Sequence, residues 1–122
     1  MKLSQKTNET LYVIFRVIIG ILFLMHGWTK VPGVMNGSIP LVSLMALAGL
    51  IEIVGGLFFI IGLWVRPTAM ITAIEMVVAF FKVHVPQGLN PLTNQGEPAV
   101  LFFVAFLVLV VYGAGKWAID KR

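Results

Sequence analysis

Residues 16–30 read Arg16-Val-Ile-Ile-Gly20-Ile-Leu-Phe-Leu-Met-His26-Gly27-Trp28-Thr-Lys30, and they impose a constraint that the other helices must meet. The apolar run that contains them is long enough to cross a membrane as one helix. It nevertheless carries an arginine near one end and a His-Gly-x-x-Lys cluster at the other. An ionised side chain at the centre of a spanning helix costs about 2.5–3.5 kcal/mol on insertion scales. Arg16 therefore needs a partner on another helix.

The composition is that of an integral membrane protein. Of the 122 residues, 59% are hydrophobic and 11% are charged, and the mean hydropathy is +0.98. A soluble domain of this size could not bury that much apolar surface. The length fits one compact unit, and no stretch is polar enough to form a second domain. We therefore expect residues 1–122 to form a single transmembrane domain.

Charge and cysteine content exclude several classes of function. The net charge is +4, but the nine basic residues are scattered along the chain instead of forming a patch with aromatic residues, so we expect no nucleic-acid partner. The absence of cysteine excludes a disulfide, a zinc–thiolate site, an iron–sulfur cluster and a thiol redox pair in this chain. Any redox chemistry would need a bound cofactor.

Prolines and turn residues divide the chain into four predicted helices, at about residues 11–30, 41–64, 68–83 and 98–117. Pro67 ends the second helix, because proline cannot continue a helix, and starts the third. The third helix is short for a full span, so we expect its outer end to be irregular. Residues 83–98 contain three prolines and form the longest predicted loop. The sequence thus predicts an all-α, four-helix membrane bundle.

The ionisable residues of these helices fall into two predicted layers. At about 1.5 Å per residue, Arg16 and Glu75 lie roughly 8 and 10 Å from the cytoplasmic ends of their helices. Glu52 and His26 lie deeper, at roughly 18 and 22 Å. We therefore expect Arg16 to pair with Glu75, with Glu52 as the alternative partner.

Glu52 is the strongest candidate for chemistry. A carboxylate without a partner near the middle of the membrane favours its neutral form, so Glu52 could carry a proton or bond to a polar headgroup. His26 and Lys30 lie four residues apart on one helix face and could together meet a quinone oxygen, an anion or a carboxylate. Lys30 could instead extend to the membrane surface. The charges could also serve only to hold the helices together.

A metal or haem site is disfavoured. Haem held between His26 and His84 would require both to lie in packed helix interiors, whereas His84 lies beside Pro86 in a predicted loop. We expect no metal site, and a helix-end histidine is more often a polar cap.

The ordered set of motifs resembles the DoxX family over nearly the whole chain. Its elements are Arg16 with Gly20, His26-Gly27-x-x-Lys30, Glu52-x-x-Gly55-Gly56 with Gly62 and Arg66, Met76-x-x-Ala79, His84, Asn94-x-Gly96-Glu97-x-Ala99 and Gly113-x-Gly115-x-Trp117-x-x-Asp120. The resemblance implies a four-helix prokaryotic membrane protein related to the membrane subunit of thiosulfate:quinone oxidoreductase and to proteins tied to redox stress. The chain departs from the pattern at Glu75, an extra carboxylate, and at Gln95, where glycine is common.

Together these features suggest a multi-pass subunit of a quinone-linked redox system in the prokaryotic cytoplasmic membrane. Glu52 and His26 are the candidate catalytic residues. The candidate quinone-binding residues are Arg16, His26, Lys30, Glu52 and His84. Membrane lipid and a larger complex or homo-oligomer are the expected partners. Two alternatives remain open, namely a non-catalytic anchor or assembly subunit and a small proton-coupled transporter.

The basic residues predict the orientation, because lysine and arginine are enriched on the cytoplasmic side. Six fall on one side, Lys2, Lys6, Arg66, Lys116, Lys121 and Arg122, and two on the other, Lys30 and Lys82. Reporter fusions at both termini should therefore read cytoplasmic, and a fusion within residues 83–98 should read external. A cytoplasmic signal from that loop would contradict the four-helix topology.

Overall fold

The computed structural model describes residues 2–121 and contains helices and loops but no strand within that range. The elements are α1 (Gln5–Trp28), the short α2 (Val31–Met35), α3 (Leu44–Ile61), α4 (Val65–Ala79) and α5 (Glu97–Tyr112). A π-helical turn at Phe80–His84 and a 3₁₀ turn at Val85–Gln87 extend α4. The prediction of an all-α fold with four main helices is confirmed, as is the irregular outer end of the third.

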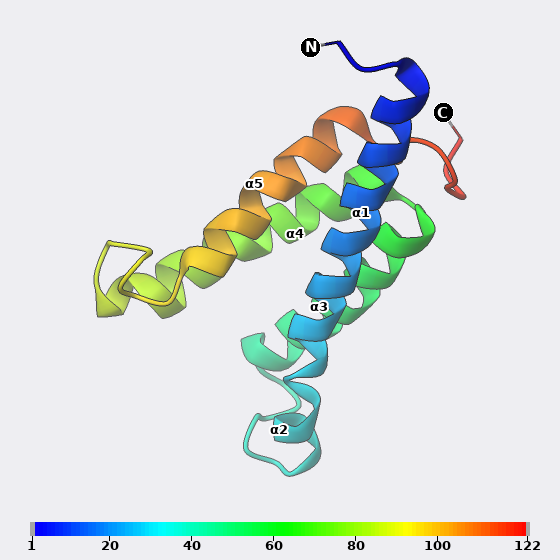
Figure 1. The fold of residues 1–122 in the computed structure, drawn as a ribbon. Helices are drawn as coiled ribbons and strands as arrows, with labels where there is room; N and C mark the ends of the chain where they lie inside the picture. The colour runs from blue at the N-terminus through cyan, green and yellow to red at the C-terminus, as the bar shows by residue number, and fades with distance from the viewer. Residues whose placement is uncertain (1, 122) are drawn as a thin grey trace.

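The four main helices form two antiparallel pairs. α1 packs along α3, and α4 packs along α5. The pairs diverge from the end of the molecule that holds the α3–α4 turn, the start of α1 and the C-terminal segment (Figure 1). The opposite ends carry α2 on one pair and the loop at 88–96 on the other.

A glycine seam joins α1 to α3. Gly20 lies opposite Gly56, so that a Cβ atom built on either would come within 2.8 Å of the other's carbonyl oxygen. Seven residues further along α1, a Cβ atom on Gly27 would lie 2.8 Å from the carbonyl oxygen of Gly49. Small residues allow helices to approach closely in lipid, where packing has to hold them together. The matched spacing of seven residues thus fixes the register of the two antiparallel helices.

Phenylalanines fill the centre where the two helix pairs meet. Phe23 of α1, Phe59 of α3 and Phe106 of α5 are each 1% exposed or less. The ring centroids of Phe23 and Phe106 lie 4.8 Å apart with an edge-to-face arrangement, and those of Phe59 and Phe106 lie 5.4 Å apart. Such aromatic pairs stabilise packing beyond the area they bury.

The exterior of the molecule is apolar, as expected for a protein surrounded by lipid. Large aliphatic side chains such as Ile18, Leu50, Ile74 and Leu101 are about half exposed or more. Three helical segments are long and apolar enough to cross a membrane, namely Gln5–Met35, Leu44–Ile61 and Val65–Gln87. The fourth, Glu97–Tyr112, is apolar but shorter.

Arg16 does not pair with Glu75, and this expectation was wrong. The guanidinium is 1% exposed and donates hydrogen bonds only to backbone carbonyls within residues 2–121. Nε donates to Phe59 O, and Nη2 donates to Trp117 O, each at 2.9 Å. Nη1 donates to Lys116 O at 2.9 Å and also to Ala114 O. One carbonyl at the end of α3 and three in the segment that follows α5 thus surround the charge that we expected a carboxylate to balance.

The C-terminal segment, residues 113–121, is folded back onto the helices instead of continuing α5 to residue 117 as expected. The helix ends at Tyr112 because Gly113 adopts φ +73°, which breaks the helical path. Asp120 then caps the start of α4. Its carboxylate accepts hydrogen bonds from the backbone N–H groups of Trp64, with N to Oδ1 at 2.7 Å, and of Val65, with N to Oδ2 at 2.9 Å. This cap supports Trp64 in a left-handed conformation at φ 47°.

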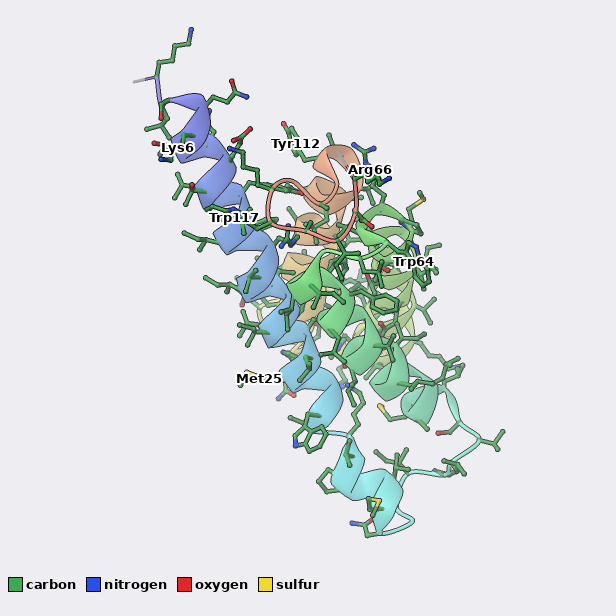
Figure 2. All side chains as sticks on the ribbon, turned by 90° about the vertical axis from the view of Figure 1, so that its right-hand side faces the viewer. Lys6, Met25, Trp64, Arg66, Tyr112 and Trp117 are labelled. Atoms are coloured by element: carbon green, nitrogen blue, oxygen red, sulfur yellow. The ribbon has the colours of Figure 1, made fainter. Side chains whose placement is uncertain are left out.

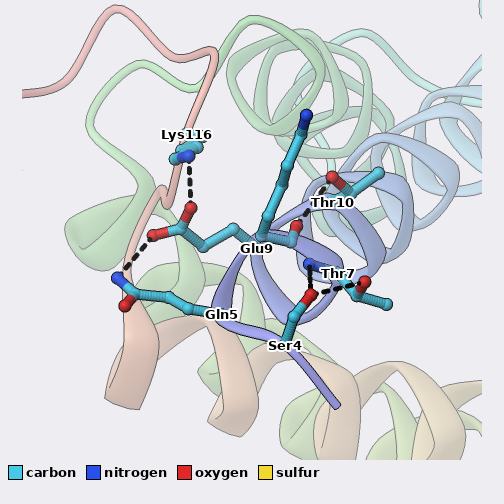
Figure 3. A network of polar contacts seen from close by, with 7 residues as sticks. Ser4, Gln5, Thr7, Glu9, Thr10 and Lys116 are labelled. Atoms are coloured by element: carbon cyan, nitrogen blue, oxygen red, sulfur yellow. Dashed lines mark hydrogen bonds and ion pairs between the residues drawn. The ribbon is translucent and has the colours of Figure 1, made fainter.

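Further contacts tie the segment to the first turns of α1. Lys116 forms an ion pair with Glu9, whose carboxylate also accepts a hydrogen bond from Gln5 (Figure 3). Tyr12 donates its hydroxyl to Gly113 O at 2.5 Å. The segment therefore connects α1, the α3–α4 turn and the end of α5.

Replacing Arg16 by lysine tests whether the carbonyl cage needs a guanidinium. Lysine keeps the charge but presents its donors from a single nitrogen, so it cannot satisfy the carbonyls of both α3 and the C-terminal segment. We expect Arg16→Lys to lower the stability by about 3–5 kcal/mol, as for other buried charges left without their partners. Arg16→Met should also destabilise the fold, because it leaves the four carbonyls without their donor.

Thermal unfolding in detergent measures this loss, and limited proteolysis should show earlier cleavage within residues 113–121. Glu75→Leu is the matched control, because it removes the partner we first expected and should leave cleavage of the segment unchanged. Wild-type stability of Arg16→Lys would contradict the cage.

Candidate functional site

An ion pair between Lys30 and Glu52 lies between α1 and α3. The ammonium nitrogen is 2.7 Å from Glu52 Oε1, and the side chains are 21% and 6% exposed. Lys30 follows the last turn of α1, and its side chain folds back along the helix so that Nζ lies 3.4 Å from His26 O. The charge therefore does not extend to the membrane surface but reaches the level of Glu52.

The glycine seam makes room for both charged side chains. A Cβ atom on Gly27 would lie 2.8 Å from Glu52 Cβ, so the base of the glutamate packs directly on the α1 backbone. A Cβ atom on Gly49 would lie 3.3 Å from Lys30 Cβ, so the lysine stem packs on α3 in the same way. Each partner helix thus supplies a glycine beneath the other's charge, which positions the pair.

Glu75 adds a second carboxyl to this cluster from α4. Its two oxygens are buried, and neither has a hydrogen bond that meets normal geometry with any residue from 2 to 121. Two charged groups act on this carboxyl, namely Glu52 and Lys30, and the interaction with Glu52 is the stronger one. Three helices therefore place two carboxyls and one ammonium together.

The charges of this cluster do not balance when all three groups are ionised. One cation and two anions leave a net charge of −1 in a region of low dielectric, where an uncompensated charge is costly. The cluster can become neutral by holding one proton on a carboxyl or by accepting a donor group from a ligand. The arrangement is therefore suited to taking up and releasing a proton.

His26 lies at the rim of the cluster. The residue is exposed, and its ring meets Phe102 of α5 edge-on with centroids 5.1 Å apart. Its backbone carbonyl accepts from Lys30, but its ring nitrogens form no hydrogen bond within residues 2–121. The ring is thus accessible to a ligand that reaches Lys30.

The other two candidate residues lie elsewhere. Arg16 belongs to the carbonyl cage at the far end of the α1–α3 pair. His84 lies in the π-helical turn, where Nδ1 is 3.1 Å from Asn94 O. Asn94 is fully buried and bonds to Gly88 O and to Gly96 N, each at 2.7 Å, which closes the loop at 88–96. The structure does not bring His26 and His84 together through any contact of their rings.

No cluster of three or more potential metal ligands occurs among residues 2–121.

The loop at 88–96 also contains Gln95, where the chain departs from the glycine that is common in the DoxX pattern. This residue adopts φ 62°, a left-handed conformation that glycine accepts with less strain.

The sequence reasoning missed that Glu75 faces Glu52, although helix positions could have shown it. Glu52 lies nine residues before the end of α3 at Ile61, and Glu75 lies ten residues after the start of α4 at Val65. Counted from their shared turn, the two are level at about 14 and 15 Å. The predicted bounds ended the second helix at residue 64 and started the third at residue 68, three residues beyond the observed ends in each case, which separated the two carboxyls in depth.

The comparisons with known proteins give one family model and several full-length relatives. The DoxX family model matches residues 11–85. An uncharacterized protein of Haemophilus influenzae is 35% identical over 97% of this chain and 94% of its own length. "Inner membrane protein YqjF" of Escherichia coli is 29% identical over 96% and 95%. "Putative oxidoreductase CatD" of Bacillus subtilis is 30% identical over 95% and 89%. No solved structure is significantly similar to the chain.

A double-mutant cycle tests the ion pair. Lys30→Met should lower stability by about 3–5 kcal/mol, because it leaves two carboxyls close together without a cation. Glu52→Leu should also destabilise, and the double variant should recover much of the combined loss, since an apolar pair of similar size is often neutral.

Thermal unfolding in one detergent supplies all three values. Lys82→Met is the matched control, because Lys82 is exposed and lies outside the cluster. Strictly additive losses would show that Lys30 and Glu52 do not interact.

Proposed function

This chain belongs to the DoxX family, and we propose that it is the membrane subunit of a quinone-linked redox system, with Lys30, Glu52 and Glu75 handling protons beside the quinone. The observation that carries the proposal is the buried carboxyl of Glu75, which has no hydrogen bond within residues 2–121 and lies beside an ion-paired carboxylate. Perturbed carboxyls without partners are typical of functional sites. The name of the B. subtilis relative describes an oxidoreductase, which supports a redox function.

The donor groups of the cluster fit a quinone. Its two carbonyl oxygens accept hydrogen bonds, and when bound it supplies a two-electron acceptor that takes up two protons. Lys30 can donate from its ammonium, and His26 can donate from an exposed ring next to Phe102. Lys30 and His26 would hold and orient the oxygens.

The carboxyls of the cluster would supply the protons. Once Lys30 has given a proton to a ligand oxygen, the proton held on Glu75 can pass through Glu52 to the neutral amine and restore the ammonium, because these groups form one continuous cluster. Loss of that proton returns the cluster to a net charge of −1, which favours uptake of another from the aqueous side.

The electrons would come from a partner protein. This chain has no cysteine for an iron–sulfur cluster or a thiol pair, so its own residues offer no electron carrier. We therefore propose that it works within a larger complex or a homo-oligomer. Its proposed location is the cytoplasmic membrane, in line with the name of the E. coli relative, which is an inner membrane protein.

An anchor or assembly subunit is the second candidate, and the contacts of Arg16 and His84 favour it. Both residues are engaged with backbone carbonyls that hold loops in place. Such contacts stabilise a scaffold and need no chemistry. The two functions differ in whether the carboxyls of the cluster must ionise.

Glu52→Gln separates these two functions. Glutamine keeps the shape and an acceptor for Lys30, and Glu75 can balance the lysine charge, so the subunit should fold and assemble normally. Its loss of the titrating group should lower quinone-linked turnover at least about 100-fold, as expected for a positioned proton donor. Glu75→Gln should likewise lower turnover while retaining quinone binding.

The measurement uses complexes purified in mild detergent, with assembly and quinone reduction followed on the same preparation. Glu97→Gln is the matched control, since Glu97 is exposed at the start of α5. Full turnover by an assembled Glu52→Gln complex would refute the protonic role and favour the anchor.

A further inference from the structure

A cavity of about 470 Å³ lies where the α3–α4 turn meets the end of α5 and the C-terminal segment. Its lining includes Trp64, Arg66, Tyr112, Gly113, Asp120 and Lys121. Ligand sites in proteins typically measure about 300–1,000 Å³, so the space is sufficient for a small ligand group. In Figure 2, Arg66 and Tyr112 lie toward the end of the molecule opposite α2.

The cavity carries an excess of positive charge. Its carboxylate, Asp120, already accepts two backbone N–H groups as the cap of α4. Within residues 2–121, the ion pairs are those of Lys30 and Lys116, so Arg66 and Lys121 have no carboxylate partner there. Arg66 donates one hydrogen bond, from Nη2 to Val111 O at 3.2 Å, which orients the guanidinium and leaves further donors for a ligand.

The backbone is shaped to hold Arg66 at the cavity wall. A Cβ atom on Gly113 would lie 3.1 Å from Arg66 Nε and 3.3 Å from Cζ, so a side chain at this position would push the guanidinium away by a few tenths of an ångström. Gly113 also needs φ +73° to end α5. The same residue thus turns the chain and positions the arginine.

Two aromatic residues place the cavity at the depth of lipid headgroups. Trp64 is 60% exposed and Tyr112 is 68% exposed, at the ends of α3 and α5. Tryptophan and tyrosine favour the membrane–water interface, because their rings are apolar and their N–H and O–H groups are polar. A cationic cavity between such residues lies where the phosphates of lipids are found.

We propose that this cavity binds the phosphate headgroup of an anionic membrane lipid through the guanidinium of Arg66 and the ammonium of Lys121. A planar guanidinium can donate two parallel hydrogen bonds to phosphate oxygens, and the lysine adds a mobile point charge. Free phosphate offers the same chemistry, but the flanking aromatic residues favour a ligand with an acyl tail. The proposal is independent of any quinone chemistry.

The test uses the full chain purified in an uncharged detergent. Phosphatidylglycerol, phosphatidylcholine and inorganic phosphate are titrated separately, with tryptophan fluorescence reporting binding near Trp64 and thermal unfolding reporting stabilisation. The variants are Arg66→Gln and Lys121→Gln, and Lys82→Gln removes the same charge at the opposite end of α4. Lys121 makes no hydrogen bond within residues 2–121, so its variant should unfold at the wild-type temperature without lipid.

Phosphatidylglycerol should stabilise the wild type and bind about fivefold more weakly to each of the two cavity variants, the loss expected for one basic residue at an anionic surface. Lys82→Gln should bind like the wild type. Equal responses to phosphatidylglycerol and phosphatidylcholine, or undiminished affinity of Lys121→Gln, would overturn the site. Saturation by inorganic phosphate with no added effect of the lipid would overturn the lipid as its source.

Discussion

The hydrogen bonds from Arg16 to four backbone carbonyls are the contact on which the arrangement of the helices depends. They join α1 to the end of α3 and to the C-terminal segment, which in turn caps α4 through Asp120. A guanidinium suits this role, because its five donors point in fixed directions and it stays charged in a buried place. The charge is stabilised by the dipoles of one carbonyl in the last turn of α3 and three carbonyls of the C-terminal segment.

The helix number and the main turns could be predicted from the sequence, because they follow from local properties. Apolar runs of spanning length, proline at helix starts and the short third run correctly indicated the spans and the irregular end after α4. The fold-back of residues 113–121 could not be predicted in this way. It depends on contacts with residues about 100 positions earlier in the chain, such as Tyr12 and Arg16.

The candidate site was predicted in part. The glycines on α1 and α3 indicated a close helix pair, and the structure places Lys30 and Glu52 on that seam. The partner of Arg16 was predicted wrongly, because matching residues by depth assumes that a buried cation needs a carboxylate. The matched glycine spacing would have given a better answer: Arg16 precedes Gly20 by four residues, which places it opposite the last turn of α3, close to open carbonyls.

The unbalanced charge around Glu52 follows from this choice of partner for Arg16. Had Arg16 paired with Glu75, each carboxylate in the membrane would have had its own cation, and the cluster would have had no reason to hold a proton. Because backbone carbonyls satisfy Arg16 instead, Glu75 is left beside Glu52 and shares the single ammonium of Lys30 with it. The cage that stabilises one end of the α1–α3 pair therefore leaves the carboxyl of Glu75 on α4 without a cation of its own among residues 2–121.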